Sequence, residues 1–157
     1  MIRYVVAVLL AAALVAASIP AVESAATARG ESIVESNVVE IEVAAETLLE
    51  DERLPPNGML GPQRAVELSF PSASLTAAPV RHLELERVDD ENVTIARYRV
   101  GGGSMQTVTV DAPIVDESMG SPIELGRPTG DVTYVLLLQR DPNDHDRPVV
   151  VLTRTSR

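Results

Sequence analysis

The stretch ESIVESNVVEIEVAAETLLEDE, residues 31–52, decides the fold of this chain. Its apolar residues recur at steps of four and three, which is the spacing of one face of an α-helix; they are Val34, Val38, Ile41, Ala45 and Leu48. Glutamates lie on the remaining faces, so the helix has one apolar face to bury. The prolines and glycine of LPPNG, residues 54–58, predict that the helix ends near Arg53.

Two interpretations of this apolar face follow from the spacing. In the first, the face packs on a sheet of the same chain, which is the usual place of such a stripe in a small domain. In the second, it is a lateral assembly seam through which the helix of residues 31–52 forms a homo-oligomer or hetero-oligomer. The two do not exclude each other, because different parts of one helix can contact different neighbours.

The remainder of the chain has the period of β-strands. After the linker PPNGMLGP, residues 55–62, apolar and polar residues alternate in short segments separated by turn residues. The segments lie at residues 66–70, 81–88, 92–100, 105–110, 122–126, 132–140 and 148–154. They predict a largely antiparallel β-sheet of about six or seven strands. Since a sheet with one apolar face needs a cover, the sequence predicts an α+β fold in which the sheet packs on the amphipathic helix.

The N-terminus predicts a membrane segment. Residues 4–22, YVVAVLLAAALVAASIPAV, carry no charge and are just long enough to cross a hydrocarbon core of about 30 Å. Arg3 precedes them and Glu23 follows, which favours a single pass in the cell membrane with the N-terminus cytoplasmic and the C-terminal domain outside. The bilayer is therefore an expected partner of residues 4–22.

A cleavable signal peptide is the alternative interpretation of the same residues. Ala26, Thr27 and Ala28 form an A-x-A arrangement before Arg29, and cleavage there would release a secreted protein. In both interpretations the domain is exported across the membrane. The expected organisation is an anchor or signal peptide at 1–22, an amphipathic helix at 23–54, the linker at 55–62 and an antiparallel β domain at 63–157.

The composition limits the classes of partner. The chain has 157 residues and a net charge of −10, with no cysteine and every basic residue an arginine. Such a surface repels nucleic acid, so we expect no nucleic-acid partner. Acidic excess without lysine is typical of a protein kept soluble in concentrated salt, and it predicts a halophilic source. Without cysteine there is no disulfide and no thiolate ligand or nucleophile.

No pattern of residues points to catalysis or to a cofactor, so we expect neither an enzyme nor a bound cofactor. Oxygen-bearing side chains gather in the turn of residues 141–146, and a cation could contact Asp141, Asn143, Asp144 and Asp146. The turn lacks the glycine and distal glutamate of an EF-hand loop, so a solvated turn without metal is the main interpretation. The sequence NVT makes Asn92 a candidate for glycosylation.

The overall plan resembles that of pilins and pseudopilins, in which an apolar helix continues into an amphipathic helix that is followed by an antiparallel sheet. This resemblance covers the whole chain and rests mainly on residues 2–60. Only Met1, Ile2 and Arg3 precede the apolar run, and its early part has no glutamate, so processing by a prepilin peptidase is not expected.

More narrowly, five segments look like those of a small uncharacterised family of haloarchaeal membrane-anchored proteins. They are MIRYVVAVLL at the start, LPPNGMLGP with RAVELSFP, TAAPVRHLELER, and RPVVVLTR near the end. The resemblance implies type II/IV secretion or pilus-like gene neighbourhoods. The expected function is thus a noncatalytic, membrane-anchored component of such an assembly, accessory or pseudopilin-like; the alternative is an exported ligand-binding or calcium-binding β module.

Overall fold

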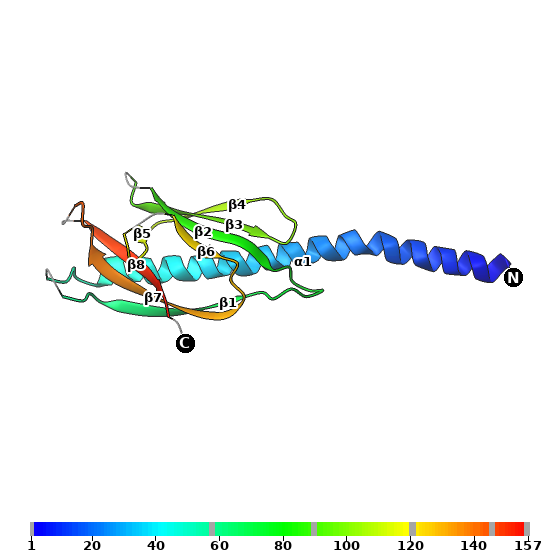
Figure 1. Cartoon of the computed structure of the whole chain (residues 1–157), viewed down its shortest axis with the longest axis horizontal. Helices are drawn as coiled ribbons and strands as arrows, with labels where there is room; N and C mark the ends of the chain where they lie inside the picture. The colour runs from blue at the N-terminus through cyan, green and yellow to red at the C-terminus, as the bar shows by residue number, and fades with distance from the viewer. Residues whose placement is uncertain (1, 57–58, 89–90, 120–121, 145–146, 156–157) are drawn as a thin grey trace.

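A computed structural model describes residues 2–56, 59–88, 91–119, 122–144 and 147–155 (Figure 1). Its first element is one long helix, α1 (Ile2–Asp51). The strands that follow are β1 (Gln63–Phe70), β2 (Val80–Val88), β3 (Val93–Val100), β4 (Gln106–Val110), β5 (Ile114–Val115), β6 (Ile123–Gly126), β7 (Gly130–Arg140) and β8 (Pro148–Arg154).

Helix α1 is continuous through Pro20 and Gly30, and it has two different surroundings. Its first half projects away from the rest of the molecule as a rod, and its second half lies along the strands (Figure 1). The side chains of residues 3–25 are exposed, whereas buried positions begin at Ala26 and recur to Leu48. The same helix therefore has an uncovered part, residues 4–22, which we call the apolar rod, and a part that serves as the spine of the β domain.

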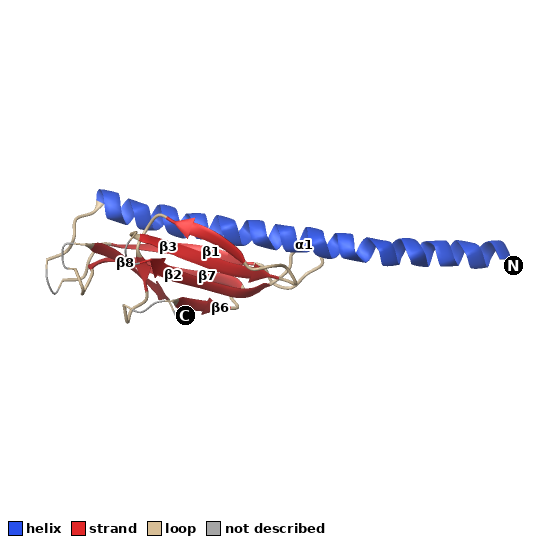
Figure 2. Cartoon of the chain, turned by 90° about the horizontal axis from the view of Figure 1, so that it is seen from above, coloured by secondary structure: helices blue, strands red, loops and turns tan. Residues whose placement is uncertain are grey.

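The strands form two four-stranded sheets, in the orders β1-β7-β8-β5 and β4-β3-β2-β6. All neighbouring pairs are antiparallel except β5 and β8, which are parallel. Helix α1 contacts strands of both sheets, and Figure 2 shows it running along one side of the strand layers. One core cluster joins the buried face of α1 to the inner faces of both sheets.

The predicted α+β fold, with a helix followed by antiparallel strands, is confirmed. The structure differs from the expected single sheet of six or seven strands, since the described residues form eight strands in two sheets. The chain changes sheets four times, between β1 and β2, between β4 and β5, between β5 and β6, and between β6 and β7. A hairpin and a crossing between sheets carry similar turn residues, so strand periodicity does not distinguish them.

Buried Thr94 fixes one of these crossings. Its Oγ1 donates to the carbonyl of Ala112 at 2.7 Å and accepts from the backbone N–H of Ile114 at 2.9 Å. The side chain thereby satisfies two backbone groups in a segment that leaves one sheet for the other. Strand β5 can then pair with β8.

The connection from α1 to β1 depends on close backbone approach. A Cβ atom on Gly61 would lie 1.9 Å from the carbonyl oxygen of Leu138, and the N–H of Leu138 donates to Pro62 at 2.9 Å. Only glycine fits so close to another backbone. The helix itself ends at Asp51, two residues from the predicted end at Arg53, which is within the usual uncertainty of helix ends.

Candidate functional site

The apolar face predicted from the sequence packs inside the chain itself. Its five residues are almost fully buried, with exposed fractions of 0% for Val34, 1% for Val38, 1% for Ile41, 0% for Ala45 and 4% for Leu48. All five belong to the core cluster that includes both sheets. The structure therefore shows the first of the two interpretations, packing on the chain's own sheets. A partner could reach these side chains only if the domain opened.

Polar contacts attach the same part of α1 to both sheets. Asn37, which is buried, donates from Nδ2 to the carbonyl of Ser69 in β1 at 3.0 Å. On the other side, the hydroxyl of Tyr98 in β3 donates to Glu35 at 3.0 Å. Burial of Tyr98 and this bond to Glu35 raise the pKa of the phenol well above its ordinary range. The tyrosine is thus held neutral as a hydrogen-bond donor.

The opposite face of α1 is exposed and uncharged. We call it the outer stripe, and it consists of Ala21, Ala25, Ala28, Ser32, Ser36, Val39 and Val43. Steps of four and three place these residues on one side of the helix. Val39 is 49% exposed and Val43 is 54% exposed, although both lie beside the domain. The outer stripe was missed in the sequence because small residues do not produce a strong hydrophobic pattern, but its spacing was readable.

The outer stripe continues into the apolar rod. Among the described residues, α1 is the one helix that is long and apolar enough to cross a membrane, and the most apolar part of it is not buried by any other part of the molecule. This helix lies near the N-terminus and fits a single-pass membrane protein. Its apolar side chains could contact a lipid bilayer, which is the environment that an all-round apolar helix requires.

Asp141, one of the candidate metal ligands in the turn of residues 141–146, has a different role. This side chain is buried, and its carboxylate accepts from Arg87 at 2.6 Å and from the backbone N–H of Asn143 at 2.9 Å. Burial alone would raise the pKa of Asp141, but the hydrogen bonds from Asn143 and Arg87 outweigh it and hold the pKa below its ordinary value. Asp141 thus joins the end of β2 in one sheet to the turn after β7 in the other.

The other candidate ligands of this turn do not converge with Asp141 on one point in the described part of the chain. Asn143 and Asp144 are exposed, and Asp144 forms an ion pair with Arg147 at 3.4 Å. Asp146 lies outside the described residues. A cation at Asp141 would have to displace Arg87, and the stabilisation from the buried ion pair would then be lost.

The predicted glycosylation site, Asn92, lies in the hairpin turn between β2 and β3. Asn92 is exposed and has a φ of 56°, a left-handed conformation that asparagine tolerates better than most residues. Thr94 of the same NVT sequence is buried and hydrogen-bonded in the core. Modification of Asn92 stays a prediction. It would have to occur before the domain folds, because folding buries Thr94.

His82 belongs to a surface network of charges. Its Nε2 lies 3.1 Å from Glu84, whose other oxygen accepts from Arg97 at 3.2 Å. Arg97 also pairs with Glu86, and the two glutamates hold the pKa of Arg97 above its ordinary value. Such cross-strand pairs are common on the outer faces of sheets. The expectation that the protein is not an enzyme stays a prediction.

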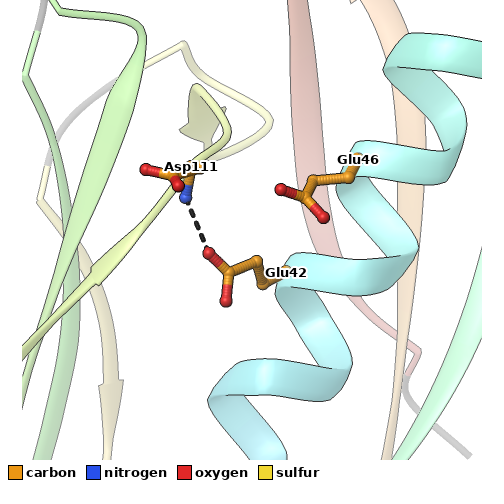
Figure 3. Close-up of side chains that lie close together, drawn as sticks. All are labelled: Glu42, Glu46 and Asp111. Atoms are coloured by element: carbon orange, nitrogen blue, oxygen red, sulfur yellow. Dashed lines mark hydrogen bonds between the residues drawn. The ribbon is translucent and has the colours of Figure 1, made fainter.

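Sequence reasoning also missed an acidic cluster formed by Glu42 and Glu46 of α1 with Asp111 after β4 (Figure 3). One carboxylate oxygen of each residue lies within 4.8 Å of the others. The backbone N–H of Asp111 donates to Glu42 at 2.9 Å, which fixes their approach. Oxygen ligands of this kind suit a hard cation, but three like charges without a counterion repel one another.

Replacement of Glu46 by Gln is therefore expected to raise the thermal unfolding midpoint at low ionic strength. The gain should be about 0.5 kcal/mol, the size of a like-charge pair one helical turn apart, and it should shrink as salt screens the charges. Exposed Glu67 on β1 provides the control, since Glu67→Gln leaves the acidic cluster intact. Melting curves of both variants across a salt series check this; a loss of stability in Glu46→Gln at every salt concentration would contradict it.

A hollow of about 750 Å³ opens at the end of the β domain that faces the apolar rod. It lies between α1 and two loops, the connection from β1 to β2 and the turn from β3 to β4. Its charged lining residues are Glu23 and Glu31 of α1 and Arg81 of β2. The turn approaches α1 closely here, since a Cβ on Gly103 would lie 3.1 Å from Glu31 and 3.2 Å from Thr27.

Comparison with known proteins identifies the chain at the level of a family. No curated protein and no solved structure matches it. One family matches residues 1–155, from the apolar rod to the end of the last strand. The chain belongs to this family, which is described as a domain of unknown function (DUF7311).

Proposed function

We propose that the protein is a noncatalytic, single-pass membrane protein of a halophilic archaeon whose β domain lies outside the cytoplasm. In this proposal it is an accessory or pseudopilin-like component of a type II/IV secretion or pilus-like surface assembly. The observation that carries the proposal is the division of α1 into a free apolar rod and a domain spine that still exposes an uncharged outer stripe. The arrangement resembles the pilin plan of a long helix whose second half is covered by a β domain.

The packing of α1 supports an anchor that is retained. The A-x-A arrangement at Ala26–Ala28 lies inside the helix, and the buried side chain of Ala26 packs on the domain. The carbonyl of Ala26 accepts from the N–H of Ala78 at 2.9 Å. Cleavage before Arg29 would cut the helix within the part that the domain covers, whereas signal peptides end outside the folded domain.

The charge distribution supports the orientation and the source. Arg3 precedes the apolar rod and Glu23 follows it, the arrangement that keeps the N-terminus in the cytoplasm. The net charge of −10 with no lysine suits a surface bathed in concentrated salt, where screening weakens the repulsion among carboxylates.

The outer stripe supports lateral assembly through α1. Alanine and serine at Ala21, Ala25, Ala28 and Ser32 permit close approach of a second helix, and such small residues are typical of helix contacts in and near membranes. Val39 and Val43 extend the stripe with exposed apolar surface beside the acidic domain. The proposed occupant is the corresponding helix of another assembly subunit, which would cover surface that water now contacts.

Cysteine crosslinking in the membranes of the source cells tests this proposal. The chain has no native cysteine, so Ser36→Cys and Val43→Cys each introduce one defined site on the outer stripe. We expect both variants to give crosslinked adducts of higher mass with short bifunctional reagents. Exposed Thr129, between β6 and β7, provides the matched control as Thr129→Cys. Equal crosslinking at stripe and control positions would contradict lateral assembly through α1.

The alternative is an exported ligand-binding or calcium-binding β module, and the acidic cluster is where it would act. An acidic cluster alone does not make a cation site, so the assembly component is the function that we propose. Melting of the full chain with and without calcium separates the two, since a ligand that binds the native state raises its stability. A calcium-dependent gain that disappears in Glu46→Gln would favour the alternative.

A further inference from the structure

We propose that the loop between β1 and β2, residues 71–79, rests on the bilayer that holds the apolar rod, with Leu75 inserted among the lipids. We call this segment the β1–β2 loop. The inference rests on the anchor part of the proposed function, and it adds a second contact between the protein and the membrane. Its consequence is a fixed orientation of the β domain against the lipid surface.

Leu75 is the side chain that points to this contact. It is 85% exposed at the end of the β domain that faces the apolar rod. Both views show the loop after β1 reaching toward the N-terminal half of α1 (Figures 1 and 2). Leu75 and Thr76 line a hollow together with Val22 and Arg29 of the helix. A leucine left in water at this position forgoes the favourable burial of its side chain.

The height of Leu75 along the helix matches the lipid interface. The uncharged run of α1 ends at Val22, and Glu23 is the first charged residue after it. Val22 to Arg29 spans about 10 Å of helix at 1.5 Å per residue. The polar layer on each side of the hydrocarbon is about 5–8 Å thick. A side chain that lies beside Val22 is therefore at the depth where the helix leaves the hydrocarbon.

The β1–β2 loop is held in one conformation before it meets lipid. The N–H of Ser74 donates to the carbonyl of Ala77 at 3.1 Å, and the N–H of Ala77 donates to Oγ of Ser74 at 3.0 Å. This turn places Leu75 and Thr76 at its tip. The N–H of Ala78 donates to Ala26 of α1, so the loop is tied to the helix. A preorganised loop loses little conformational freedom when its tip inserts.

Glycine at position 30 permits this contact between the loop and the helix because it has no side chain. A Cβ atom there would lie 2.7 Å from the carbonyl oxygen of Ala78 and 2.5 Å from the side chain of Val100. Any larger residue would push the loop away from α1. The position of Leu75 beside Val22 thus depends on glycine at position 30.

The charge pattern suits a lipid surface at this end of the domain. Residues 68–80 carry no charged side chain, although 23% of the chain is charged. The net charge of −10 repels anionic headgroups elsewhere, so the uncharged loop is the part of this end that can approach them. Arg29 lies beside Leu75, at the level where a guanidinium can bind phosphate oxygens while its stem stays near the acyl chains.

Depth measurement with single-cysteine variants of the full chain tests the inference. Thr76→Cys reports on the β1–β2 loop, Leu14→Cys on the apolar rod, and Leu60→Cys on the other end of the β domain, where Leu60 is 86% exposed. Each variant carries an environment-sensitive fluorophore and is reconstituted in vesicles of phosphatidylcholine and phosphatidylglycerol. Quenching is measured with nitroxides on the lipid headgroup and, separately, deep in the acyl chain.

We expect the headgroup nitroxide to quench the probe at position 76 and the acyl-chain nitroxide to quench the probe at position 14, with neither effect at position 60. Quenching at 14 with a position-76 signal equal to that at 60 overturns the inference and leaves the anchor standing. No acyl-chain quenching at 14 overturns the anchor and the inference together.

A second substitution tests whether the side chain of Leu75 itself makes the lipid contact. In the labelled Thr76→Cys chain, Leu75→Ser should lower the ratio of inserted to withdrawn loop about tenfold, since the burial of one leucine is lost. Leu60→Ser in the same chain is the matched control and should leave the ratio unchanged. Quenching at 76 that is the same with and without Leu75→Ser would also overturn the inference.

Discussion

Replacement of Val38 by Asp is expected to unfold the β domain, whereas the same replacement at neighbouring Val39 leaves it folded. Val38 is 1% exposed and packs in the core cluster with strands of both sheets. An aspartate there would bury a charge without a partner, a change that costs several kcal/mol and exceeds much of the stability of a small domain. Val39 is 49% exposed on the outer stripe, where a carboxylate stays in water.

Circular dichroism and limited proteolysis of the full chain in detergent check this pair. Their contrast separates the two faces of α1, because Val39→Asp should also weaken crosslinking through the outer stripe while the domain stays folded. If Val38→Asp folded as well as the unsubstituted chain, the apolar face of α1 would not be the core of the domain. The helix would then be free to use that face as an assembly seam.

Replacement of Asp141 by Asn is expected to lower the free energy of unfolding by about 3–5 kcal/mol, the usual cost of removing one charge from a buried ion pair. The side chains of Arg87 and Asp141 are 9% and 4% exposed, so water can replace the lost carboxylate only poorly. Their contact of 2.6 Å connects the two sheets at residues 54 positions apart in the sequence. Denaturant unfolding of the two proteins in the same salt measures the difference.

The pH dependence of stability provides an independent test of the same pair. Because folding lowers the pKa of Asp141, its contribution is fully present above the unfolded value of about 3.9 and is lost as the pH falls through the lower folded value. Asp141→Asn should therefore remove part of the steep loss of stability below about pH 4.

The control is Asp144→Asn in the same turn, where the side chains of the ion pair with Arg147 are about half exposed. It should change the stability by less than about 1 kcal/mol. Equal effects of the two substitutions would contradict the assignment of Asp141 as the buried link between sheets.

The sequence predicted the helix, seven of the eight described strands and the class of fold because their periodicity is local, whereas the two-residue strand β5 is too short to show one. It did not predict two sheets, since the crossings depend on contacts such as Thr94 with Ala112 and Ile114, which a single strand pattern does not contain. The helical spacing also identified the face of α1 that is buried. Spacing reveals an apolar face but not which neighbour covers it, so the lateral seam and the sheet contact looked alike.

The remaining parts of the candidate site have weaker local signals. The outer stripe consists largely of alanine and serine, which a hydrophobic pattern passes over. Leu75 is a single apolar residue in a loop, and only the fold places it beside Val22. The sequence made Asp141 a candidate cation ligand because carboxylate oxygens bind cations. Its actual partner, Arg87, lies in a distant strand.

Our central claim is that α1 is one uncut helix that anchors the protein and carries the β domain. The intact mass and N-terminal sequence of the native protein, recovered from membrane and medium fractions, test it most directly. We expect a membrane-bound chain that begins at Met1 or Ile2 and retains the apolar rod. A soluble chain that begins at Arg29 would contradict the claim, because the rod would then be an export signal and α1 would begin within the domain.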